Sequence, residues 1–320
     1  MSIIFWVAKS YPKKKLLMSR EQRTNIQNLT TYNTLVKLLR EFFLSKGFLE
    51  VATQPNLTIL SACENPFSVA TYTFDGKIWP MAQTGQMILE EVLLKNPNIP
   101  GCFCISTSYR DEKNPIPGRH KKVFNMFEFE SKGGMEELKK LERELLIYLG
   151  FNDPVEVKYE DMCEKYGGVE ILEDEHESKM WKELGSVISL QDFTRKTQPF
   201  WNMKYRGNNI FNKIDVILYG QETIGSAERS CNVDEMKEMF YNIMDGGYAN
   251  KLFELFGKER VEKELEEFLS LDFFPRYGGG IGLTRLSRAW ELLQEEKAEY
   301  RKKFQKISNS VKVERPETLS

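Results

Sequence analysis

Residues 278–285, with the sequence GGGIGLTR, place an arginine closely after a run of glycines. Glycines let a ligand approach the backbone, and Arg285 at the start of a helix adds a forked cation to the positive end of the helix dipole. This combination suits a terminal phosphate. It is neither a dinucleotide fingerprint, because Arg285 stands where the third glycine is needed, nor a GxxxxGK phosphate loop. A plain glycine turn before a helix is the alternative interpretation.

A second segment combines charges with an aromatic ring. Arg110 and Glu112 end one predicted strand, and residues 124–130 (FNMFEFE) form the next. Strand alternation places Arg110 and Glu112 on one face, and on the partner strand it places Phe124 on the same face as Glu128. Such a surface suits a purine nucleotide, because the ring can stack on the base while the arginine holds a phosphate. A solvated hairpin with cross-strand ion pairs is the alternative.

Two acidic residues lie in a third segment. Asp215 stands in the apolar run of residues 214–218, and Glu222 follows a bend that contains Gly220. Mg²⁺ takes few protein ligands and keeps several waters, so two carboxylates beside phosphates are sufficient for it. A structural ion pair between Asp215 and Arg229 is the alternative.

In this order the three segments resemble the signature motifs of the class II aminoacyl-tRNA synthetases, in the branch for Asp, Asn and Lys. Residues 47–51 (GFLEV), with Pro55 further on, are similar to the first motif, which forms the dimer interface in that family. Residues 110–124 are similar to the second motif and residues 280–285 to the third. The likeness covers roughly residues 25–300, and such ordered agreement is more specific than any one motif.

Within this branch the sequence is most similar to the catalytic domain of asparaginyl-tRNA synthetases. Residues 84–90 (TGQMILE), 124–130 (FNMFEFE) and 222–229 (ETIGSAER) are similar to the SGQLxxE, FWMIEPE and EIIGGSQR stretches of that family. The resemblance implies a ligase that uses ATP and Mg²⁺ to form an aminoacyl-adenylate and releases pyrophosphate.

The resemblance also implies roles for individual residues. Arg110 would hold the α-phosphate and Arg285 the γ-phosphate of ATP, and these two would be the catalytic residues. The other expected ATP-binding residues are Glu112, Arg119, His120, Phe124 and Glu222. Asp215 and Glu222 would carry Mg²⁺. The expected amino-acid-binding residues are Glu64, Gln86 and Glu128 around the α-ammonium group, with Glu90 and Arg229 at the side-chain end.

The acyl acceptor and the substrate side chain are the open parts of this interpretation. The family carries an N-terminal anticodon-binding barrel, and here the expected N-terminal arm is too short for a domain, so we expect weak tRNA binding. The family has a glycine-serine pair where this chain has Ser226 and Ala227. The acceptor alternatives are tRNA, ammonia (an aspartate–ammonia ligase), a protein or a small molecule; a non-catalytic binding paralogue is a further one.

Glu90 favours asparagine over aspartate as the substrate. The aspartate-specific relatives have a lysine at the position of Leu89, and an acid at the side-chain end repels a carboxylate but accepts hydrogen bonds from a carboxamide. The alternative is that Glu90 points to solvent and pairs with a lysine.

Composition agrees with such an enzyme. The chain has 320 residues, 41% hydrophobic and 29% charged, with a net charge of −2. The hydrophobic fraction excludes a disordered protein, and the near-zero net charge excludes a protein whose main function is strong binding to nucleic-acid phosphates. The five cysteines form no CxxC pair, and no signal peptide or membrane span is present, so we expect a cytoplasmic protein.

The elements that must position these residues follow from periodicity. Helices are expected over residues 21–46, 86–95 and from about 138, two more within 234–270, and one after Gly282; strands are expected over 103–109, 123–130 and 214–218. Because strands and helices do not alternate strictly, we expect an α+β fold, an antiparallel sheet flanked by helices. The expected divisions are an arm (1–20), a catalytic domain (21–306) with an insertion at about 155–210, and a tail (307–320). Apolar surface on the first helix and the strand after it predicts a homodimer.

Overall fold

The computed structural model describes residues 28–53, 57–60, 64–114 and 121–311, and all structural statements concern these residues. Arg119, His120 and Pro55, and the parts of the expected arm, first helix and tail that fall in 1–27 and 312–320, lie outside them.

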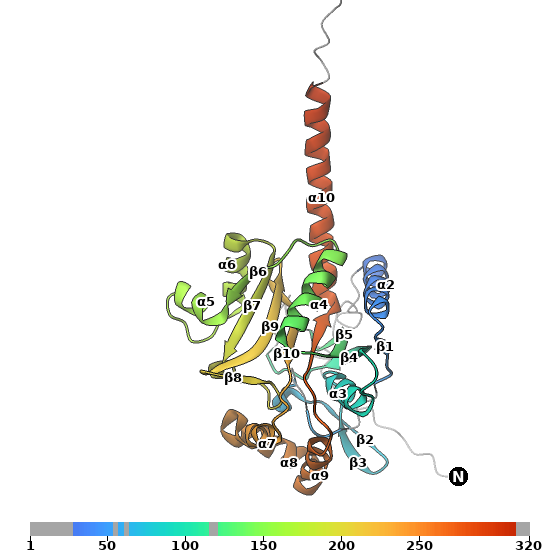
Figure 1. Ribbon diagram of the computed structural model, residues 1–320, viewed down its shortest axis with the longest axis vertical. Helices are drawn as coiled ribbons and strands as arrows, with labels where there is room; N and C mark the ends of the chain where they lie inside the picture. Colours follow the sequence, from blue (N-terminus) through green and yellow to red (C-terminus); the bar gives the residue numbers. More distant parts are fainter. Residues whose placement is uncertain (1–27, 54–56, 61–63, 115–120, 312–320) are drawn as a thin grey trace, which may run out of the picture.

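A mixed sheet of nine strands forms the centre of the fold (Figure 1). The strand order is β1 (Leu49–Glu50), β4 (Gly101–Tyr109), β5 (Val123–Lys132), β11 (Arg276–Gly282), β10 (Gln221–Glu228), β9 (Ile210–Leu218), β7 (Val187–Thr194) and β6 (Val155–Lys158), and β8 (Tyr205–Gly207) pairs with β9. The pairs between β4 and β7 are antiparallel, whereas the edge pairs β1–β4 and β6–β7 are parallel. The expected sheet flanked by helices is therefore confirmed, with parallel pairing at its two edges.

Three helices pack on the sheet around the largest core: α2 (Leu29–Ser45), α4 (Met135–Tyr148) and the first turns of α10 (Leu283–Val311). Asn28 caps α2, because its Oδ1 accepts hydrogen bonds from the backbone N–H groups of Thr30 and Thr31. Gly47, at φ +79°, ends the same helix, which is the glycine signal that the sequence gives at this point. The rest of α10 extends beyond the body of the molecule (Figure 1).

Aromatic rings fill this core beneath β4 and β5. The ring centroid of Phe43 lies 4.9 Å from that of Phe127 and 5.2 Å from that of Phe129, and Phe103 stacks on Phe127 at 5.1 Å. Because side chains alternate along a strand, the residues between these phenylalanines point to the opposite face of the sheet. The apolar positions of β5 thus fix which of its residues reach the functional site.

The second core lies under α3 (Gln86–Lys95), α7 (Val233–Asn242), α8 (Gly247–Phe256) and α9 (Lys258–Leu269). Three helices therefore occupy the region where the sequence pattern predicted two. A break explains the difference: the short 3₁₀ turn Ile243–Gly246 separates α7 from α8, and Met244 and Asp245 in it have positive φ. The hairpin of β2 (Thr71–Phe74) and β3 (Lys77–Pro80) lies at this end of the molecule (Figure 1).

The segment from about 155 to 210, which the sequence suggested as an insertion, supplies β6, β7 and β8 to the sheet. It also contains α5 (Tyr159–Lys165) and α6 (Asp174–Leu184). The remaining short 3₁₀ turns are Pro66–Ser68 and Arg195–Thr197. Among the described residues, no helix combines the length and the apolar character that crossing a membrane requires.

Candidate active site

A cavity of about 440 Å³ lies over the centre of the sheet, where β5, β11 and β10 are neighbours. Alternate residues of β5 face it: Phe124, Met126 and Glu128 line its wall. The alternation that the sequence predicted for this strand is therefore confirmed. Most of the predicted site residues that the structure describes line the same cavity: Gln86, Arg110, Glu112, Phe124, Glu128, Glu222, Arg229 and Arg285.

The predicted nucleotide end is built around Arg110 and Phe124. The guanidinium carbon of Arg110 lies 5.1 Å from the centroid of the Phe124 ring. Nε of Arg110 is buried and has no hydrogen-bond partner among the described residues. A buried donor without a partner is costly, so this arginine is poised for an anionic ligand. Glu112 and Lys121 also line this end of the cavity.

The glycine run is strand β11 and not a turn before a helix. A Cβ atom added to Gly278 would collide with Oε2 of Glu130. One added to Gly279 would lie 2.6 Å from Ser226 Cβ, and one added to Gly280 would lie 2.7 Å from Met126 Cε. These glycines therefore make room for side chains of the neighbouring strands, and their backbone forms the floor of the cavity.

Arg285 lies in the first turn of α10 at the edge of the cavity. Its Nη1 donates a hydrogen bond of 2.7 Å to the backbone carbonyl of Glu222 and lies 3.6 Å from Oε2 of the same residue. Glu222 of β10 thus holds the guanidinium in place at the start of α10. About a third of the side chain stays exposed, so it is available to a phosphate.

Asp215 and Glu222 lie on β9 and β10 and meet beside Gly225. A Cβ atom added to Gly225 would lie 3.0 Å from Oε1 of Glu222 and 3.6 Å from Oδ1 of Asp215. Oδ1 is buried and has no hydrogen-bond partner among the described residues. Burial raises the pKa of Asp215 to about 7, and the neighbouring Glu222 adds to this, although Lys213 opposes it.

This arrangement fits a divalent ion. Oε1 of Glu222 and the buried Oδ1 of Asp215 both lie close to Gly225, and carboxylate oxygens are the ligands that Mg²⁺ prefers. Glu222 lines the cavity, whereas Asp215 lines a neighbouring hollow. The described residues contain no cluster of three or more metal-binding side chains, so an ion here would need oxygens of a ligand or water.

The predicted amino-acid end contains Glu128 and Gln86. Glu128 is fully buried, and it accepts hydrogen bonds from the backbone N–H of Gly85 at 2.8 Å and from the hydroxyl groups of Thr84 and Ser106. Burial raises its pKa despite these donors. Gln86, in the first turn of α3, donates to the backbone carbonyl of Phe129 at 3.1 Å.

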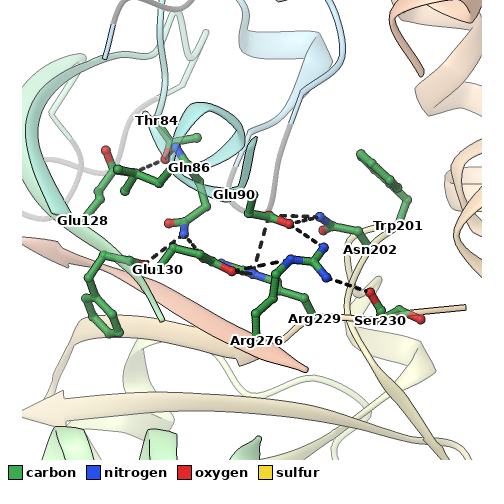
Figure 2. Close-up of polar contacts among 12 residues, drawn as sticks. Thr84, Gln86, Glu90, Glu128, Glu130, Trp201, Asn202, Arg229, Ser230 and Arg276 are labelled. Atoms are coloured by element: carbon green, nitrogen blue, oxygen red, sulfur yellow. Dashed lines mark hydrogen bonds and ion pairs between the residues drawn. The ribbon is translucent and has the colours of Figure 1, made fainter. Parts of the chain in front are cut away.

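Four buried charges lie behind Gln86: Glu90, Glu130, Arg229 and Arg276, each at most 1% exposed (Figure 2). Arg229 donates from Nε and Nη2 to the two oxygens of Glu130, at 3.2 Å each. Arg276 Nη2 donates to Oε2 of Glu90 at 2.8 Å. We call these residues the charge quartet; its formal charges sum to zero.

The position of Glu90 differs from both expectations. Its side chain does not line the cavity, and it does not point to solvent. Nδ2 of Asn202 lies 2.9 Å from each of its oxygens, and Nε of Arg229 lies 3.5 Å from Oε1 (Figure 2). The reason is the distant Arg276, which fixes the carboxylate inside the protein. Glu64 likewise lies off the cavity lining and accepts a hydrogen bond from the backbone N–H of Gln83 at 3.3 Å.

Burial raises the pKa of Glu130 to about 7; Arg229 lowers it and Glu90 raises it. Of the quartet, Arg229 alone reaches the cavity lining. Phe200 covers its guanidinium, with the carbon 5.1 Å from the ring centroid.

Sequence reasoning missed Arg276 and Lys213. Arg276 precedes the glycine run in an apolar stretch, FFPRYGGG, and a charge between buried aromatics is a signal that it needs a partner. Lys213 is two residues before Asp215, and strand alternation places both on one face. Among the described residues, Thr284 and Arg288 also line the cavity without having been predicted.

Comparison with known proteins agrees with this geometry. A family model described as tRNA synthetases class II (D, K and N) matches residues 9–297. The chain belongs to this family. A comparison of this chain with curated proteins finds no match.

Solved structures of the same fold include synthetases from three organisms. The chain resembles asparaginyl-tRNA synthetase from Pyrococcus horikoshii, complexed with asparaginyl-adenylate, with a TM-score of 0.68 and 18% identity over 84% of this chain and 65% of that one. The asparaginyl-tRNA synthetase of Entamoeba histolytica, also in complex with asparaginyl-adenylate, has a TM-score of 0.64 and 18% identity over 83% of this chain and 64% of that one. A putative aspartyl-tRNA synthetase from Leishmania major Friedlin has a TM-score of 0.63 and 16% identity over 82% of this chain and 61% of that one. The chain thus spans less than two thirds of the length of each, and the likeness shows the fold.

Proposed function

We propose that the protein is a ligase that activates asparagine, or an asparagine-like amino acid, with MgATP to form an aminoacyl-adenylate. The observation that carries this proposal is one cavity lined by Arg110 and Phe124, whose guanidinium carbon and ring centroid lie 5.1 Å apart, and by Arg229 of the neutral charge quartet. Family membership supports the activation of an amino acid.

In this proposal, adenine lies on Phe124 and the α-phosphate meets Arg110. The γ-phosphate meets Arg285. A carboxylate oxygen of the amino acid attacks the α-phosphorus, the bond to the β-phosphate oxygen breaks, and pyrophosphate leaves with the bonding electron pair. The arginines neutralise charge on the phosphates without reorganising, so catalysis is positioning and electrostatics. Asp215 and Glu222 would hold Mg²⁺, which would supply positive charge against the phosphates.

The side-chain preference rests on the charge quartet. Arg229 faces the cavity, but Glu130 already accepts hydrogen bonds from its Nε and Nη2. A carboxylate entering beside it would add a negative charge to a dry, neutral cluster, whereas a carboxamide adds none. The neutral quartet behind Arg229 therefore supports asparagine over aspartate, although Glu90 itself does not line the cavity. It makes the ammonia-dependent ligase the second candidate.

Amino-acid-dependent exchange of pyrophosphate into ATP tests the proposal. Arg285→Ala should reduce exchange at least 100-fold, because it removes a cation that acts on the leaving group. Arg143→Ala is the matched control: Arg143 is exposed on α4 and pairs with Asp153, so its loss should change exchange less than twofold. Both variants should retain the thermal unfolding midpoint of the wild type within a few degrees. Unchanged exchange in Arg285→Ala, or no exchange with any amino acid in the wild type, contradicts the proposal.

A further inference from the structure

Lys213 lies beside the carboxylate pair at the predicted phosphate end of the cavity. Its Nζ donates a hydrogen bond of 2.7 Å to Oδ2 of Asp215, and it lies 3.9 Å from the centroid of the Phe193 ring. The side chain is 27% exposed and lines the cavity together with Glu222. The lysine is thus paired with the carboxylate of Asp215 at the edge of the cavity.

Lys213 divides the oxygens of Asp215 between two tasks. Oδ2 binds the lysine, while Oδ1 is buried without a hydrogen-bond partner among the described residues and lies beside Gly225 with Oε1 of Glu222. With the lysine in place, the three side chains carry a formal charge of −1. One such charge is little compensation for the hydration that a divalent ion gives up, and Mg²⁺ dehydrates reluctantly.

A second hollow, of about 350 Å³, lies on the other side of these residues. Lys213 and Glu222 line both cavities, whereas Asp215 and Phe193 line the second and not the first. The lysine is therefore held from two directions, by the Asp215 oxygen and by the Phe193 ring, which is attractive for a cation. A long side chain restrained at both sides keeps its charge at a fixed distance from the carboxylates.

We propose that Lys213 is a resident counter-cation that makes divalent-ion binding conditional on the nucleotide. By holding Oδ2 of Asp215 it weakens the affinity of the carboxylate pair for a free ion, so that an ion binds only when phosphate oxygens arrive with it. This proposal rests on the proposed ATP site. Lys213 is then a positioning residue, which acts through Asp215 and not on the reacting atoms.

Mn²⁺ binding to the full chain, measured by the electron paramagnetic resonance signal of the free ion, tests this inference without any turnover. In Lys213→Met the aliphatic stem remains and the charge is lost, so free Mn²⁺ should bind at least tenfold more tightly than in the wild type. Lys213→Arg keeps the charge and should bind free Mn²⁺ as weakly as the wild type. Adding Asp215→Asn to Lys213→Met should reverse the gain, which places the ion at this carboxylate.

A non-hydrolysable ATP analogue completes the design. With it, the wild type should bind one Mn²⁺ per chain tightly. The inference is wrong if Lys213→Met and the wild type bind free Mn²⁺ equally, or if the wild type binds it as tightly without the analogue as with it. Lys213→Gln serves as the neutral variant if Lys213→Met does not fold. Failure of the analogue to bind, measured by equilibrium dialysis without metal, contradicts the proposed function instead, while the free-ion comparison still decides the role of Lys213.

Discussion

Glu90→Gln changes the charge quartet by one unit and tests the geometry that supports asparagine. Glu90 is fully buried, 2.8 Å from Arg276 and 3.5 Å from Arg229, so its loss leaves two arginines against the single carboxylate of Glu130. Two unit charges about 4 Å apart attract by roughly 4 kcal/mol at an effective dielectric constant of 20. Breaking a buried pair at one partner costs about 3–5 kcal/mol of unfolding free energy, and we expect a loss in this range.

The glutamine also meets the wrong partners. Its NH₂ group would face N–H groups of Arg276, Asn202 or Arg229, because Glu90 accepts hydrogen bonds from the first two and lies 3.5 Å from Nε of the third. Urea unfolding measures the loss of stability. Glu91→Gln is the matched control on the same helix: Glu91 is partly exposed and pairs with Lys95 one turn away, and its change should cost less than about 0.5 kcal/mol.

The same variant should shift the amino-acid preference. A surplus positive charge behind Arg229 favours a carboxylate in the cavity, so the ratio of exchange with aspartate to exchange with asparagine should rise at least tenfold, which is about 1.4 kcal/mol. Aspartate should also stabilise the variant against heat more than asparagine does. Stability equal to that of Glu91→Gln would refute the buried quartet, and an unchanged preference would refute the charge argument.

Three further predictions concern assembly, tRNA and pH. Leu44 and Leu49, each 52% exposed on α2 and β1, should lie in a homodimer interface, so light scattering should give about twice 37.4 kDa and Leu49→Asp should give the monomer. A chain with a net charge of −2 should bind tRNA weakly and lose that binding steeply with added salt; efficient charging at physiological salt would contradict this. Burial raises the pKa of Glu142 to about 8, although a hydrogen bond from Ser226 lowers it and Asp215 adds to the rise. The stability that this protonated acid contributes is present below its ordinary pKa of 4.5 and is lost as the pH rises to about 8, by up to roughly 5 kcal/mol. The free energy of unfolding, measured with urea from pH 5 to 9, should fall less in Glu142→Gln than in the wild type. Glu136 is exposed on the same helix, so Glu136→Gln should follow the wild type.

Local patterns predicted much of the fold because burial here follows short periods. The helix predicted over residues 86–95 is α3 with the same bounds, and the two strands around residue 115 pair as expected. In β5 the sequence alternates phenylalanines with glutamates, so one face had to enter the aromatic core and the other had to face the site. The break at Met244 and Asp245 was missed, because methionine gives no signal for a positive φ; aspartate is one of the residue types enriched there, but a positive φ is uncommon outside glycine.

Charges in the interior could not be placed in the same way. Whether Glu90 faces solvent, ligand or protein depends on Arg276, which is 186 residues away, and no local period connects the two. The glycines of β11 show the same limit: their spacing signals close approach, but the sequence does not show that Gly278 is approached by the Phe129 carbonyl and by the side chains of Glu130 and Gln86. A charged residue in an apolar stretch indicates that a partner is needed, and the three-dimensional structure identifies that partner.

The departure at Ser226 and Ala227 is an example in which the fold supplies the reason. Ser226 pairs with Gly279 across the strands, its Cβ fills the space that the glycine leaves, and its hydroxyl donates to the buried Glu142 on α4. A serine at this place therefore connects the floor of the cavity to an acid on the other side of the sheet. Since Asp215 raises the pKa of that same acid, a negative charge gained at Glu142 would oppose one at Asp215. Ser226 thus contacts an acid whose charge is coupled to Asp215 at the predicted phosphate end, whereas in the proposed function the side-chain end of the substrate depends on the charge quartet.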